Sequence, residues 1–137
     1  MSTPSTDILW ELQKAMTVVL KTDAQIQSIC TGIFDTAPAN QPYPYITIGE
    51  ATQKNDDSFD GPGEDILTTM HIWSQEAGFK EALAIKFRMY QLLHRQHQNL
   101  IMNGYSAYKC YHDFSATLRD PDGLTRHVIT RYRILAE

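Results

Sequence analysis

Three histidines and one cysteine are the residues of this sequence whose types and spacing could support chemistry. His94 and His97 are three residues apart near the predicted end of a helix, a spacing that can turn two imidazoles toward one metal ion, and His112 follows. A metal site needs a third and a fourth ligand that converge with this pair, and the sequence indicates none. Histidines near the C-terminal end of a helix also interact favourably with the helix dipole. We therefore predict no metal and no cofactor.

Cys110 and His112 alternate onto one face of a predicted strand, which suggests a nucleophile with its base. Residues two apart on a strand are about 7 Å from each other, too far for a hydrogen bond. Cys30 and Cys110 lie in apolar stretches, so we predict buried free thiols in a reducing compartment. Glycine-rich phosphate loops, metalloprotease helix motifs and nucleophile elbows are missing from the sequence. We predict no catalytic residue and no enzyme. The alternative is a small cytosolic hydrolase or ligand-binding domain with Cys110 and His112 in a pocket.

The charged residues are divided unevenly along the chain. Residues 1–75 carry a net charge of −7 and residues 76–137 a net charge of +3, which gives −4 in total. Such a division suits a subunit that meets differently charged partners on different surfaces. Equally, the two halves could neutralise each other within the fold. The total argues against a protein whose main task is to hold nucleic acid.

The elements that position these residues follow from the hydrophobic pattern. With 137 residues and 42% hydrophobic content, the chain is predicted to form one domain, residues 1–137, and no apolar run approaches the roughly 18 residues of a membrane span. Ser5 or Thr6 is predicted to cap the first helix. The predicted elements are helices over 7–20, 24–29 and 79–95, strands over 33–34, 45–49 and 65–74, a long acidic loop over about 50–63, and a C-terminal β-hairpin.

The C-terminal hairpin has a nearly fully specified turn, Asp120-Pro-Asp-Gly123. Asp, Pro and Gly stand at the positions that a type I turn followed by a glycine bulge prefers. This turn predicts Asp120 opposite Leu124 and one mostly apolar face for the hairpin. The register that follows pairs Phe114 with Thr130, His112 with Tyr132, Cys110 with Ile134, Ala116 with Val128, Asp113 with Arg131, and Tyr111 with Arg133.

The expected fold class is α+β, with a largely antiparallel four- to five-stranded sheet and two main helices packed on one face. The helix over 79–95 is apolar around most of its circumference, which indicates burial on more than one side. In so small a domain, a neighbouring subunit is a plausible second side.

Four segments in order carry a resemblance to a known family. They are Pro42-Tyr-Pro-Tyr-Ile-Thr-Ile-Gly-Glu50, His71-Ile-Trp-Ser74 leading through Gly78 into a helix, Leu118-Arg-Asp-Pro-Asp-Gly-Leu-Thr-Arg-His127, and Arg131-Tyr-Arg-Ile-Leu-Ala-Glu137. Together they resemble the tail-completion (tail-terminator) proteins of long, non-contractile-tailed bacteriophages, prophages and gene-transfer particles. The resemblance implies a homohexameric ring at the head-proximal end of the tail tube, which ends tube polymerisation and joins tail to head. The implied partners are the tail tube protein and a neck or head-completion protein, with passing contact with DNA in the lumen and no membrane.

The resemblance also implies a location, first in the host cytoplasm during assembly and then in the virion tail. A neck or head-completion protein of the connector is the alternative within the same class. For a ring, one patch must meet a different patch of the next subunit. The predicted interface lies on the loop, the apolar side of the second main helix and the polar face of the hairpin, and comprises Lys54, Asp56, Asp57, Phe59, Asp60, Phe87, Tyr90, Asp113, Arg119, Arg126, Arg131 and Arg133.

Overall fold

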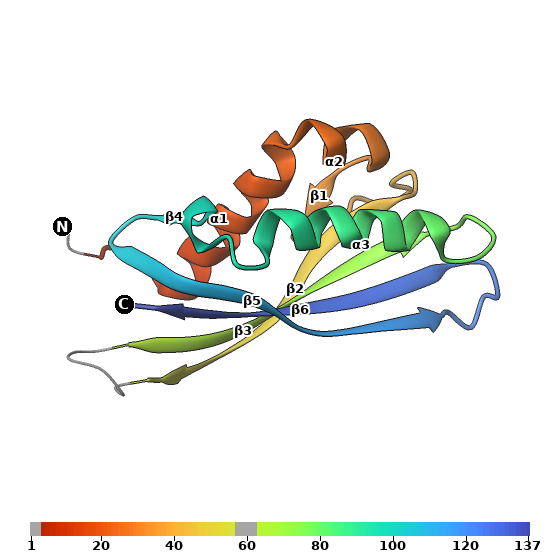
Figure 1. Ribbon diagram of the computed structural model, residues 1–137. Coiled ribbons are helices and arrows are strands. Elements are labelled where there is room, and N and C mark those ends of the chain that lie inside the picture. The colour runs from red at the N-terminus through yellow and green to blue at the C-terminus, as the bar shows by residue number, and fades with distance from the viewer. Residues whose placement is uncertain (1–3, 57–62) are drawn as a thin grey trace.

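A computed structural model describes residues 4–56 and 63–137 of the chain. One six-stranded sheet, in the order β1-β2-β3-β6-β5-β4, carries all of the helices on one face (Figure 1). The strands are β1 (Ile33–Phe34), β2 (Tyr45–Asn55), β3 (Glu64–Ser74), β4 (Ile101–Met102), β5 (Tyr105–Arg119) and β6 (Arg126–Ala136). The helices are α1 (Ile8–Thr22), α2 (Ala24–Ile29) and α3 (Lys80–Leu93), with the 3-10 turn η1 (His97–Asn99) before β4.

The predicted fold class is confirmed, but the strand count is wrong. The two-residue strands β1 and β4 extend the sheet at its edges, and β1 runs parallel to β2, so the sheet is mixed. The sequence predicts β1 as the strand over 33–34, whereas the two residues of β4 carry no alternating pattern that a sequence could reveal. Among the described residues, no helix is long and apolar enough to cross a membrane.

Aspartates begin the first two helices. Asp7 accepts a hydrogen bond from the Leu9 amide (2.8 Å), so the predicted cap by Ser5 or Thr6 is wrong by one or two residues. The Thr6 hydroxyl instead donates to the carboxylate of Glu11, which also accepts from the Asn103 amide. Asp23 caps α2 through the Ile26 amide (3.0 Å).

The core lies between the helices and one face of the sheet. Alternate residues of β3 and β6 supply most of the sheet side of the core. Helices α1 and α3 cover this side, because their buried residues recur at helical spacing. Fully buried members include Leu12, Met16, Ile66, Met70, Ile72, Ile85, Met89, Val128, Tyr132 and Ile134.

The predicted hairpin register is right at one end and wrong at the other. Cys110, Tyr111 and His112 pair with Ile134, Arg133 and Tyr132 as predicted, whereas Phe114 pairs with Arg131 and Ala116 with Ile129. The turn closes between Asp120 and Thr125, one residue later than predicted, because the Asp122 carboxylate binds the amide and the hydroxyl of Thr125.

A bulge at Asp113 absorbs the extra residue. As a consequence, Phe114 lies on the open face of the sheet, 45% exposed, and not in the core row with Cys110. The predicted pairing of Asp113 with Arg131 is wrong for the same reason.

The predicted acidic loop over 50–63 begins too early. Residues 50–55 continue β2 and pair with β3 out to Asn55 and Glu64, beyond a second bulge between Ile48 and Ala51. The polar side chains misled the prediction because this half of β2 is solvent-exposed and needs no apolar pattern. Asp57, Phe59 and Asp60, three of the predicted interface residues, lie outside the described residues.

Candidate functional site

An apolar stripe is exposed on α3, in the helical layer. Leu83, Phe87 and Tyr90 recur at helical spacing and are 38%, 60% and 36% exposed, while Ile85 and Met89 on the opposite side are fully buried. The Phe87 and Tyr90 rings lie nearly parallel, 6.4 Å apart. The structure therefore brings these two predicted interface residues together on one accessible helix face.

His94 and His112 connect the C-terminal end of this stripe to strand β5. The ring of His94 stacks on Tyr90 at 4.5 Å, and its Nδ1 accepts a hydrogen bond from the His112 amide (3.0 Å). The His112 ring in turn is hydrogen-bonded to the Ser115 hydroxyl (2.6 Å). Burial, together with the positive charge of Lys86, lowers the pKa of His112, so this imidazole is neutral at pH 7. These contacts are structural, and no group of three or more metal-ligating side chains occurs among residues 4–56 and 63–137.

Cys110 is unsuited to act as a nucleophile. Its side chain is 2% exposed, and burial raises the pKa of the thiol to about 12. A thiolate, the reactive form, is therefore scarce at neutral pH. Cys30 is also a free thiol, and its Sγ donates to the carbonyl of Gly32.

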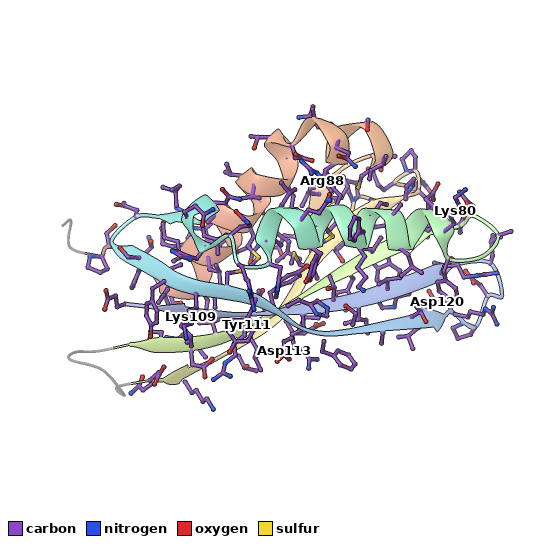
Figure 2. The ribbon with its side chains drawn as sticks, viewed as in Figure 1. Lys80, Arg88, Lys109, Tyr111, Asp113 and Asp120 are labelled. Carbon is purple, nitrogen blue, oxygen red and sulfur yellow. The ribbon has the colours of Figure 1, made fainter. Side chains whose placement is uncertain are left out.

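A shallow groove on the open face of the sheet gathers three further predicted residues. Lys54 from β2, Asp113 from β5 and Arg133 from β6 line a groove of about 310 Å³. Tyr111 and Asp113 extend from β5 on the side away from α3 (Figure 2). Arg133 forms an ion pair with Asp65 of β3 (Nε to Oδ1, 2.8 Å), and this hydrogen-bonded pairing lowers the pKa of the buried Asp65 carboxyl. Arg133 thus links β6 to β3 through this ion pair and also lines the groove on the surface of the sheet.

The remaining predicted arginines lie against aromatic rings. Arg119 and Arg126 are directly opposite across the hairpin, and their guanidinium carbons lie 5.7 and 5.8 Å from the centre of the Phe79 ring. Arg131 lies 5.2 Å from the centre of the Phe114 ring. All three arginines therefore make cation–π contacts within the fold.

Sequence reasoning missed a polar ladder across β2, β3 and β6 on the open face. Glu50 Oε2 lies 3.1 Å from His71 Nε2, and His71 Nδ1 lies 2.7 Å from His127 Nε2. The His127 ring stacks on Trp73 at 3.9 Å. The alternation of His71 and Trp73 places them on one face, but His127 joins them only through the pairing of β3 with β6, for which the sequence carries no local signal.

Comparisons with known proteins agree over nearly the whole chain. The model of a protein family described as "Tail completion protein gp17" matches residues 14–137. The chain is 25% identical over 122 residues to tail completion protein gp17 of Bacillus phage SPP1, which covers 89% of each chain.

Two solved structures are similar in fold. A chain in the virion of a native gene transfer agent particle matches with a TM-score of 0.85 and 18% identity, covering 97% of this chain and 99% of that one. The structure of bacteriophage SPP1 gp17 protein matches with a TM-score of 0.63 and 22% identity, covering 98% and 95%.

Proposed function

This chain belongs to the tail completion protein gp17 family, and we propose that it caps the head-proximal end of a phage-type tail tube as a homohexameric ring. In this position the ring ends tube polymerisation and joins the tail to the head. The family match over residues 14–137 is the observation that carries the proposal.

The family consists of structural proteins of the virion and not of enzymes, and this protein is accordingly a virion structural component. The site agrees with this assignment, since Cys110 is a buried protonated thiol and His112 is engaged with Ser115. The alternative of a hydrolase built on this pair is therefore wrong.

Two exposed surfaces support the proposed ring. A cyclic assembly requires one patch to meet a different patch of the next copy. The α3 stripe is apolar and exposed, and the open sheet face carries Lys54, Asp113 and Arg133 in one groove. We assign the stripe and the polar face of the hairpin to contacts between copies, and the acidic connection between β2 and β3 to contacts with the tail tube protein or with the neck or head-completion protein.

Electron microscopy of particles made after an early stop codon in this gene tests the proposal. We expect filled heads lying apart from tails of abnormal, variable length, because an uncapped tube continues to polymerise. Expression of the intact gene from a plasmid must restore joined particles of uniform tail length, which shows that the defect comes from this protein.

Two other results would assign the protein differently. Separate heads beside tails of normal length would place it in the connector, as a neck or head-completion protein. Normal infectious particles would contradict any role in joining.

A further inference from the structure

The last halves of β2 and β5 are largely exposed. These strands have 11 and 15 residues, whereas strands commonly have about 5 or 6. Residues 51–55 of β2 are all exposed, and residues 113–119 of β5 are exposed or half-buried. The C-terminal ends of the two strands lie at opposite ends of the sheet (Figure 1). We call these segments the β2 arm (residues 51–55) and the β5 arm (residues 114–119).

Each arm lies along an edge of the sheet. The edge strand β1 pairs only with Ile46 and Thr47 of β2, and β4 pairs only with Tyr105 and Ser106 of β5. Beyond β4, the Arg95 amide and the His94 ring occupy the edge of β5 at Cys110 and His112. Within the part of the chain that the structure describes, no backbone hydrogen bond reaches the outer edge of either arm.

The directions of the arms make them complementary to each other. The pairs β2–β3, β3–β6 and β6–β5 are all antiparallel, so β5 runs antiparallel to β2 at the other side of the sheet. If the β5 arm of one copy lies beside the β2 arm of the next, the new pair is antiparallel as well. The same contact can then repeat around a rotation axis and leave no arm unpaired. Pairing of two β5 arms with each other would leave both β2 arms open.

We infer that the β2 arm of one copy pairs with the β5 arm of the next copy, so that the sheet continues from subunit to subunit; this inference rests on the proposed ring. A continuous sheet also fixes which residues face each other. Residues 115, 117 and 119 lie on the helix side of β5, and residues 51, 53 and 55 lie on the helix side of β2. Thr117 must then lie opposite one of Ala51, Gln53 and Asn55, and never opposite Thr52 or Lys54.

Disulfide cross-linking in assembled particles tests this pairing. Thr117→Cys is combined in turn with Ala51→Cys, Gln53→Cys and Asn55→Cys, and the particles are oxidised and analysed on non-reducing gels. The Cα atoms of facing residues are close enough for a disulfide. We expect one of the three combinations to give a ladder of linked copies that reducing agent removes.

Matched variants keep the test specific. Thr117→Cys with Thr52→Cys or with Lys54→Cys places the second thiol on the other face, and we expect no ladder. The parent protein reports any background from Cys30 and Cys110. A mixture of the two single variants carries one engineered thiol per copy and must stop at dimers.

Two outcomes would overturn the inference without touching the proposed function. One is a protein that is present in joined particles but gives no ladder in any of the three combinations. The other is a dimer formed by Thr117→Cys alone, which would indicate that two β5 arms pair with each other. Absence of the protein from purified particles would overturn the proposed function, and the inference with it.

Discussion

Asp23 has two roles at the residue scale. Its carboxylate caps α2 through the Ile26 amide and also binds Arg88 of α3 with both oxygens, at 2.7 and 2.9 Å. Arg88 lies on the side of α3 that faces the first two helices (Figure 2). One side chain thus begins one helix and fixes its packing against another.

We predict that Asp23→Ala lowers the free energy of unfolding by about 2 kcal/mol, because it removes a cap and leaves Arg88 without its carboxylate. Asp7→Ala, which removes only a cap, should lower it by about 1 kcal/mol. Urea unfolding followed by circular dichroism measures both values. Equal losses would contradict a structural role for the ion pair.

The Asp23 pair also predicts a pH dependence. The hydrogen bond from Arg88 holds the pKa of Asp23 below its ordinary value of 3.8. Because the folded state binds this proton more weakly than the unfolded state, its stabilisation is complete above the ordinary pKa and is lost as the pH falls through the lowered one. In Asp23→Asn the unfolding midpoint should fall less steeply as the pH is lowered below the ordinary pKa of 3.8 than in the parent protein. Parallel curves for the two proteins would contradict this prediction.

Substitution of Phe87 tests assembly independently of the stability of the fold. Its side chain is 60% exposed, so we expect Phe87→Ala to change the free energy of unfolding by no more than about 0.5 kcal/mol while it lowers the yield of joined particles. Met89→Ala, two residues away in the core, should instead cost about 3 kcal/mol. Thermal unfolding and particle titre distinguish the two effects. Normal titres for Phe87→Ala would remove the stripe from the proposed interfaces.

At the scale of elements, deletion of Asp113 removes the bulge in β5 and tests its role. Removing Asp113 leaves every pair on both sides intact, since His112 already pairs with Tyr132 and Phe114 with Arg131. We predict that the deletion variant folds, with circular dichroism like that of the parent, but that its straightened β5 arm lowers joining. Asp113→Ala keeps the bulge and serves as the control. A deletion variant that joins heads and tails normally would show that the bend has no function.

The same hairpin shows how far a sequence determines a fold. The residues near Cys110 are correctly paired by sequence reasoning only because two errors cancel: the turn closes at Thr125 and not at Leu124, and Asp113 bulges out. The closure depends on one side chain, Asp122, whose oxygens take the Thr125 amide and hydroxyl. Local patterns predict helices, strands and the α+β class well, because those depend on periodicity. A choice between two neighbouring registers depends on single hydrogen bonds.

The candidate surfaces were predictable to different degrees. Phe87 and Tyr90 are surplus apolar residues on a helix, a signal that periodicity reveals. Lys54, Asp113 and Arg133 come from three strands, and only the order β2-β3-β6-β5 brings them to one groove. The ladder of Glu50, His71 and His127 was missed for the same reason.

At the scale of the whole molecule, part of the uneven charge is neutralised internally. Arg88–Asp23 and Arg133–Asp65 each join a base of residues 76–137 to an acid of residues 1–75. These two pairs support the alternative in which the halves of the chain balance each other. The connection between β2 and β3 carries two further acids of residues 1–75, Asp57 and Asp60, which lie outside the described residues.

Replacing residues 57–62 with a short Gly-Ser turn tests that connection. We predict that folding is spared, because β2 and β3 remain paired out to Asn55 and Glu64, and that joining is blocked. The unfolding midpoint and the particle titre are the measurements. Asp57→Asn with Asp60→Asn keeps the length and tests charge alone. If particles with the Gly-Ser turn still join, the connection has no role in docking.

The tip of the last hairpin has one more consequence. Asp122 accepts hydrogen bonds from the Leu124 amide and from both donors of Thr125, and Gly123 donates to Asp120, so the turn is held from within. Leu124, 54% exposed, is presented on a loop that is already ordered. A partner that binds this tip does not have to order the loop, so the loop loses little conformational entropy on binding. The tip can therefore bind through a small contact area.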